Sequence, residues 1–109
     1  MSFFYDNNVD HIAVSGANVA VERVYCIRSG DFVDNDWSKL DAAYRSLPGW
    51  IDYLDGIPHW FGPQGAIPSL SASVEPSGLI VSGTVPVQVW ESWHATFSRE
   101  IAGLPMFEA

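Results

Sequence analysis

The stretch from residue 69 to residue 102 constrains the fold most, because a hairpin pattern there runs directly into a helix pattern. Residues Ser69 to Glu75 alternate between apolar and polar side chains, as a strand with one buried face does. Pro76 and Ser77 then supply turn chemistry, and Gly78 can take the left-handed conformation that closes a bulged hairpin. A second apolar run at residues 79–83 completes a predicted antiparallel hairpin.

The residues after this hairpin predict an amphipathic helix. Thr84 can cap it, Pro86 suits its first turn, and Gly103 followed by Pro105 ends it. Large apolar side chains recur at helical spacing within a sector of about 80°; they are Trp90, Trp93, Phe97, Ile101 and Leu104. Because this stripe follows an apolar hairpin face, we expect it to form core rather than a ligand pocket.

The first half of the chain predicts further strands and a second helix. Strands are expected at residues 10–14 and 19–27, with a short strand or an irregular entry at residues 2–5. Polar residues at 34–36 are candidate caps for a helix on which Asp41 is spaced to pair with Arg45. The apolar face of that helix is Trp37, Leu40, Tyr44 and Leu47.

Residues 50–68 are rich in glycine and proline, and we expect them to be irregular, with one helical turn or a short strand at residues 50–55. The predicted fold class is therefore α+β. It is an antiparallel sheet of about four strands packed by two amphipathic helices, in the order ββαββα and in a single domain, 1–109.

The charge of the chain narrows the choice of partner. The formal net charge is −8, with only five Lys and Arg residues, so a nucleic acid is not expected to bind directly. The same charge favours a basic protein partner.

Cys26 is the sole cysteine, which rules out an internal disulfide, and we expect it in the core. No signal peptide or membrane span is predicted, so we expect a cytoplasmic protein that binds no membrane.

An acidic stretch with interleaved aromatic residues is the candidate binding surface. Aromatic anchors with a charged rim are typical of protein–protein hot spots. His59 is the histidine that we expect to be functional, because it lies in the predicted loop. The predicted partner-binding residues are Asp31, Asp34, Asp36, Asp52, Asp55, Trp50, Tyr53, His59 and Trp60. The competing interpretation is a solvated acidic face with helix caps, in which the aromatic residues form core.

No catalytic motif is visible. The sequence lacks a nucleophile elbow, a dinucleotide-binding glycine motif and a phosphate loop. Its three histidines are too far apart to predict a metal site, so no catalytic residue, metal or cofactor is expected. Two alternatives remain open. One is a small hydrolase or isomerase with an Asp/His pair in the 50–68 loop, and the other is a subunit whose tryptophans make a permanent interface.

The hairpin and helix resemble a known class of proteins. Residues 71–83 read Ser-Ala-Ser-Val-Glu-Pro-Ser-Gly-Leu-Ile-Val-Ser-Gly, and Trp90, Trp93 and Phe97 follow. This pattern resembles small acidic immunity proteins of bacterial polymorphic-toxin and contact-dependent growth inhibition systems. The resemblance implies a cytoplasmic protein, not an enzyme, that binds one cognate toxin domain, often a basic nuclease, and occludes its active site. It assigns no individual binding residue and leaves the oligomeric state open.

Overall fold

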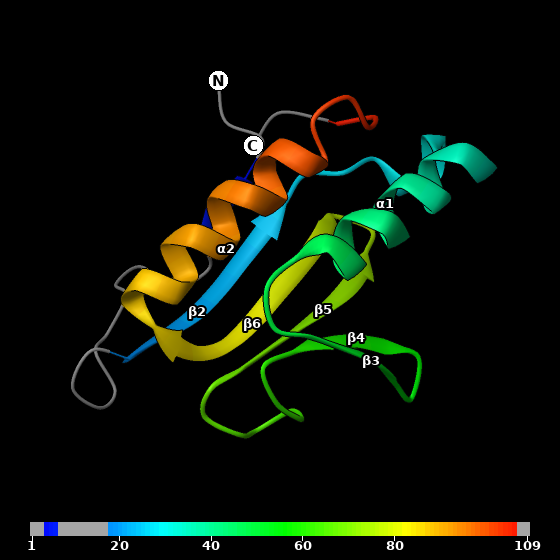
Figure 1. The fold of residues 1–109 in the computed structure, drawn as a ribbon. Helices are drawn as coiled ribbons and strands as arrows, with labels where there is room; N and C mark the ends of the chain where they lie inside the picture. The colour runs from blue at the N-terminus through cyan, green and yellow to red at the C-terminus, as the bar shows by residue number, and fades with distance from the viewer. Residues whose placement is uncertain (1–3, 7–17, 107–109) are drawn as a thin grey trace.

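The computed structural model describes residues 4–6 and 18–106. It has an α+β fold in which one antiparallel sheet carries both α-helices on the same face (Figure 1). The strand order across the sheet is β1-β2-β6-β5-β4-β3. In chain order the elements are β1 (Phe4–Asp6), β2 (Asn18–Tyr25), the 3-10 helix η1 (Ser29–Asp31), α1 (Asp34–Ser46), β3 (Trp50–Leu54), β4 (Ile57–Trp60), β5 (Ser69–Glu75), β6 (Gly78–Pro86) and α2 (Val87–Glu100).

The predicted class, an antiparallel sheet packed by two helices, is confirmed, and the predicted strand count and element order agree with the described residues only roughly. The sheet has six strands rather than about four. The additional hairpin, β3–β4, lies in the stretch that was expected to be irregular. Asp55 (φ 53°) and Gly56 (φ 79°) both have positive φ, which a tight two-residue hairpin turn requires. The strand expected at residues 10–14 lies outside the described residues.

The predicted hairpin at residues 69–83 is present, but its second strand is longer than expected. Glu75 pairs with Gly78 across the turn. Gly78 has a φ of 139°, and a Cβ atom there would collide with the backbone carbonyl of Tyr25 in β2. Since β6 continues to Pro86, Thr84 pairs with Ser69 rather than capping the helix. Pro86 itself occupies the N-cap position of α2.

Helix α1 begins where it was predicted, although none of the three candidate residues is its N-cap. Val33 occupies that position, and the Asp36 carboxylate accepts a hydrogen bond from the Val33 N–H at 3.0 Å. The expected contact between Arg45 and Asp41 is present at 2.9 Å. Trp37 was expected to be buried with the apolar face of the helix, yet its side chain is 43% exposed.

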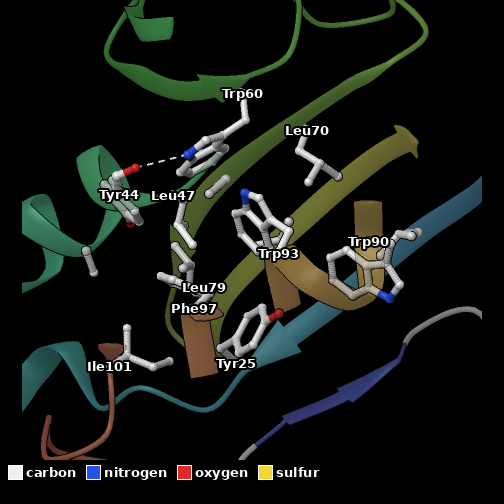
Figure 2. Close-up of a cluster of buried hydrophobic side chains, with 14 of the residues drawn as sticks. Tyr25, Tyr44, Leu47, Trp60, Leu70, Leu79, Trp90, Trp93, Phe97 and Ile101 are labelled. Carbon is white, nitrogen blue, oxygen red and sulfur yellow. Dashed lines mark hydrogen bonds between the residues drawn. The ribbon is translucent and has the colours of Figure 1, made fainter. Parts of the chain in front are cut away.

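The core lies between the sheet and the two helices and is dominated by aromatic rings (Figure 2). Trp60, Trp93 and Phe97 are fully buried, and the two indoles meet edge to face with their centroids 5.0 Å apart. Trp60 Nε1 donates a hydrogen bond to the Tyr44 carbonyl at 3.0 Å, which ties β4 to α1. The expected burial of Cys26 and of the α2 stripe is confirmed.

The burial of the tryptophans bears on the alternative of a permanent subunit interface. Trp60, Trp90 and Trp93 are at most 4% exposed, so three of the five indoles are used inside the molecule and do not supply an interface.

Within the described ranges, neither helix is long and apolar enough to cross a membrane.

Candidate functional site

A groove opens between α1, the tip of the β3–β4 hairpin and the end of β5, and we call it the acidic groove. Its volume is about 290 Å³. Buried side chains of Leu40, Tyr44 and Ala72 form its base. Trp37 and Val74, which are 43% and 40% exposed, also line it. The full lining is Trp37, Leu40, Asp41, Tyr44, Tyr53, Gly56, Ile57, Pro58, Ala72, Ser73 and Val74.

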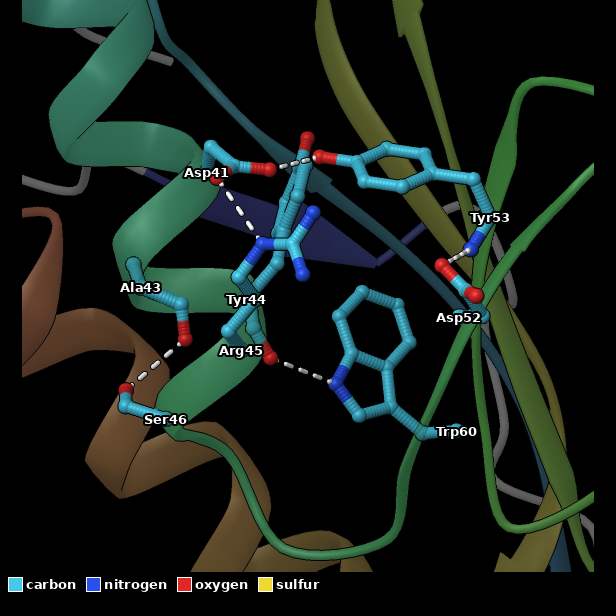
Figure 3. Close-up of polar contacts among 8 residues, drawn as sticks. All are labelled: Asp41, Ala43, Tyr44, Arg45, Ser46, Asp52, Tyr53 and Trp60. Carbon is cyan, nitrogen blue, oxygen red and sulfur yellow. Dashed lines mark hydrogen bonds and ion pairs between the residues drawn. The ribbon is translucent and has the colours of Figure 1, made fainter.

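A polar network forms one wall of the acidic groove (Figure 3). The Tyr53 hydroxyl reaches from β3 to α1 and donates a hydrogen bond to Asp41 Oδ1. Arg45 Nε donates to the other oxygen, Asp41 Oδ2, at 2.9 Å. The Arg45 guanidinium also lies 5.5 Å from the ring centroid of Trp50 and 5.7 Å from that of Tyr53. Both oxygens of Asp41 are therefore bound within the molecule.

These contacts set the charge state of the wall. The hydrogen bond from Tyr53 and the contact with Arg45 lower the pKa of the Asp41 carboxyl. Burial and the hydrogen bond to Asp41 raise the pKa of Tyr53 to about 12. Burial is also the main cause that raises the pKa of Tyr44. At neutral pH, Asp41 is an ionised acceptor and Tyr53 is a protonated donor.

Acidic residues stand beside the lining residues in the chain. Asp34 precedes Trp37 by about one helical turn. Asp55 directly precedes Gly56 at the hairpin tip, and Glu75 ends β5 directly after the last lining residue of that strand. Asp34, Asp55 and Glu75 are all exposed.

The cationic residues of the chain compensate few of these charges. Arg28 contacts Asp31 at 3.1 Å, and Arg45 is bound to Asp41. Lys39 Nζ donates to the Ala102 carbonyl at 2.8 Å. Arg23 donates to His94 Nε2 at 2.7 Å. Four of the five cationic side chains are thus held in contacts that leave Asp34, Asp55 and Glu75 uncompensated.

The structure separates the predicted partner-binding residues into three groups. Trp50 and Tyr53 are half-buried beside the Arg45 guanidinium. These two form one of the three groups, together with Asp52 and Asp55, which are exposed on the same β3–β4 hairpin. In the second group, Asp31 ends η1 and is exposed, and Asp34 and Asp36 lie in the first turn of α1, exposed and half-buried respectively. The third group, His59 and Trp60, is buried.

The expectation that His59 and Trp60 are surface residues is therefore wrong. They are 3% and 0% exposed, and the reason is that β4 lies inside the sheet between β3 and β5. Trp60 points toward the helices and binds Tyr44. Neighbouring residues of a strand face opposite sides, so His59 lies on the other face of the sheet.

The hydrolase alternative requires an aspartate beside His59, and the strand register brings Asp52 to that position. Asp52 pairs with His59 across β3–β4, and His59 pairs with Ser71 across β4–β5. However, Asp52 Oδ1 accepts the Tyr53 N–H at 2.8 Å, and His59 Nδ1 lies 2.7 Å from the Ile57 carbonyl. Each side chain is bound to backbone. Among the described residues, no group of three or more His, Cys, Asp or Glu side chains is arranged to hold a metal ion.

Sequence reasoning missed the apolar part of the groove, above all Trp37 and Val74. Both fit the apolar periodicity of their elements and were therefore assigned to buried faces. Trp37 and Val74 border the place where α1, the β3–β4 hairpin and the end of β5 meet, and both are partly exposed there. The sequence did not predict that hairpin, so it did not predict this exposure.

Comparison of the chain with models of protein families, with curated proteins and with solved structures finds no match.

Proposed function

We propose that this chain is an immunity protein, a cytoplasmic inhibitor that binds and neutralises a basic toxin domain through the acidic groove. The observation that carries the proposal is a groove lined by exposed Trp37 and Val74, with the uncompensated acids Asp34 and Asp55 close in the chain to its lining residues. The resemblance of residues 71–97 to acidic immunity proteins supports the same function.

The physical logic is a division of roles between charge and apolar contact. A net charge of −8 attracts a basic partner from a distance and raises the rate of association at low salt. Apolar side chains at the centre of a contact then supply affinity once water is excluded. A surface of this kind can cover the phosphate-binding site of a nuclease, because carboxylates take the place of phosphates there.

The test compares two double variants that remove the same amount of charge. Asp34→Asn with Asp55→Asn neutralises the two acids next to the groove, and Asn tolerates the positive φ of residue 55. Glu91→Gln with Glu100→Gln neutralises two exposed acids on α2 and serves as the control. Tagged forms of both, with the native protein, are used to capture basic proteins from lysate of the native bacterium at low and high salt.

A captured protein is then produced with each form in the same cells, and growth is measured. We expect the native protein and the α2 control to restore growth, and the Asp34/Asp55 variant to associate about tenfold more slowly at low salt. If the Asp34/Asp55 variant associates with the captured protein as fast as the native protein does, and restores growth equally well, the groove is not the binding site. A captured protein that is harmless to cells would remove the immunity function.

The second candidate is a small hydrolase or isomerase, and the observation in its favour is the row formed by Asp52, His59 and Ser71 on neighbouring strands. The first candidate is preferred because His59 is buried and both Asp52 and His59 are bound to backbone. The test is turnover of ester, amide and phosphoester substrates by the native protein and by His59→Gln. Activity that the substitution abolishes would favour the enzyme, whereas no turnover by the native protein counts against it.

A further inference from the structure

We infer that the occupant of the acidic groove is a segment of the basic partner that presents one or two aliphatic side chains flanked by Lys or Arg. This inference rests on the proposed function and names the chemistry that the groove recognises. It follows from the hydrogen bonds that Asp41 and Ser73 already make, the exposure of the apolar lining residues, the size of the groove and the sign of the charge near it.

Two polar side chains of the lining, those of Asp41 and Ser73, are already bound within the molecule. Asp41 accepts hydrogen bonds on both oxygens, from Tyr53 and from Arg45. The Ser73 hydroxyl donates to Glu75 Oε1 at 2.9 Å. A cation placed deep in the groove would meet a carboxylate that Arg45 already neutralises, so the interior favours an apolar side chain over a charged one.

The apolar groups of the lining, in contrast, are not fully used. Trp37 and Val74 come from different elements, α1 and β5, and both present about two fifths of their surface to solvent at the same groove. Scattered exposed apolar residues are ordinary on protein surfaces, but two that border one concave site form a place where an aliphatic side chain loses water on every side.

The size of the groove limits the occupant. Sites for drug-sized ligands and cofactors have volumes of about 300–1,000 Å³. At about 290 Å³, the acidic groove is at the lower end of that range, which is enough for one or two inserted side chains.

The charge around the groove fixes the flanks of the occupant. Asp34 and Asp55 stand next to lining residues in the chain, and the Arg45 guanidinium is bound to Asp41 of the lining. Lys or Arg residues on either side of the inserted side chain would meet these carboxylates at the solvent-exposed rim. An acidic segment of the same shape would be repelled.

The experiment uses three capped synthetic hexapeptides as probes: Lys-Lys-Leu-Leu-Lys-Lys, Lys-Lys-Ser-Ser-Lys-Lys and Glu-Glu-Leu-Leu-Glu-Glu. Binding is followed by NMR titration of the full chain, with the backbone amides and the tryptophan indole N–H groups as reporters. We expect the lysine–leucine peptide to shift Trp37, Gly56 and Val74. We expect the serine peptide to bind at least about tenfold more weakly, because burial of a leucine side chain is lost.

Two variants with matched exposure locate the site. Val74→Ser, at a position 40% exposed, removes an apolar group of the groove, and Ile51→Ser, at a position 43% exposed, removes one outside it. We expect Val74→Ser to weaken binding of the lysine–leucine peptide several-fold and Ile51→Ser to leave it unchanged.

The outcomes separate this inference from the proposed function. Equal binding of the leucine and serine peptides would overturn the apolar occupant while leaving an inhibitor of basic proteins intact. Equal binding of the lysine–leucine and glutamate–leucine peptides would overturn the basic flanks. Shifts confined to residues outside the groove, or no shifts with the lysine–leucine peptide, would also overturn the inference. Loss of neutralisation by the Asp34/Asp55 variant would still support the proposed function.

Discussion

The two helices pack on the same sheet, yet they cover it to different extents. On α2, the apolar stripe is completely buried, with Trp93 and Phe97 at 0% exposure. On α1, Leu40 and Tyr44 are buried at 2% and 5%, but Trp37, one turn earlier on the same predicted face, is 43% exposed. One helix therefore closes the core, and the other leaves a groove.

The difference arises from the strands beneath each helix. The long strands β2 and β6, of eight and nine residues, run under α2 (Figure 1). The 13-residue α1 instead lies against the short strands β3 and β4, of five and four residues, and the end of β5. Helical periodicity shows which residues share a face, but the length of the sheet below decides whether that face becomes core or surface.

The largest test of this comparison exchanges one tryptophan in each region for alanine. We expect Trp93→Ala to lower the free energy of unfolding by about 3–5 kcal/mol, because it empties a large volume in the closed core. Trp37→Ala should cost about 1 kcal/mol, since the indole is half in water and packs against Phe32. Urea denaturation, monitored by circular dichroism, measures both changes.

A milder variant keeps this test decisive if Trp93→Ala does not fold. Trp93→Phe retains most of the ring and removes Nε1, which has no hydrogen-bond partner among the described residues. Trp93→Phe should therefore lower the free energy of unfolding by less than Trp93→Ala does. Equal losses for Trp37→Ala and Trp93→Phe or Trp93→Ala would contradict the contrast between a closed core and an open groove.

The part of the fold that could be predicted is the part governed by local pattern. The strand β5, the turn before Gly78 and the helical spacing of Trp90, Trp93 and Phe97 each follow from neighbouring residues, and each is present in the structure. The burial of β5 does not alternate as predicted, because its first four residues are all buried and its last three are exposed. The contact between Asp41 and Arg45 was predictable for the same reason, because residues four apart share a helix face.

What could not be predicted depends on partners far along the chain. Glycine and proline at residues 56–68 indicate loop, and Pro58 in particular weakens any strand prediction. Pro58 nevertheless lies within β4, where β3 and β5 pair on either side. That pairing buries His59 and Trp60 and brings Tyr53 to Asp41, so the surface assigned from the sequence could be only partly correct.

The second prediction tests whether the Tyr53–Asp41 contact stabilises the open region. The folded protein lowers the pKa of Asp41 below its unfolded value of about 3.9, so this stabilisation is present above about pH 4 and is lost as the pH falls through the folded pKa. Tyr53 is raised from about 10 to about 12, so its contribution is present below about pH 10 and is lost as the pH rises toward 12.

Tyr53→Phe should remove the alkaline dependence, reduce the acid-side dependence to the part that Arg45 supplies, and cost about 1 kcal/mol or less at pH 7, because the Asp41 side chain is 42% exposed and screened by water. Asp41→Asn should remove the acid-side dependence. The measurement is the urea midpoint of each form from pH 2.5 to pH 11. Parallel pH curves for the native protein and Tyr53→Phe would show that the contact contributes nothing to stability.

The smallest expected change in stability concerns Asp52, on the edge strand of the open region. Strand β3 ends the sheet, and exposed strand edges promote association with other chains. Two features protect this edge: the register shifts between Trp50 and Asp52, as at a β-bulge, and the Asp52 carboxylate accepts the Tyr53 N–H at 2.8 Å. We therefore assign Asp52 to the protection of the edge rather than to the acidic groove.

Asp52→Ala should change the free energy of unfolding by no more than about 0.5 kcal/mol and should increase self-association, because it exposes the Tyr53 N–H and removes a repelling charge. Asp52→Asn removes the charge but keeps an oxygen that can accept the Tyr53 N–H, so it separates the two causes. Sedimentation velocity over a range of concentrations measures the association. If Asp52→Ala associates no more than the native protein, the register shift protects β3 by itself, and the carboxylate of Asp52 is available for another role on the face of the sheet that the helices leave uncovered.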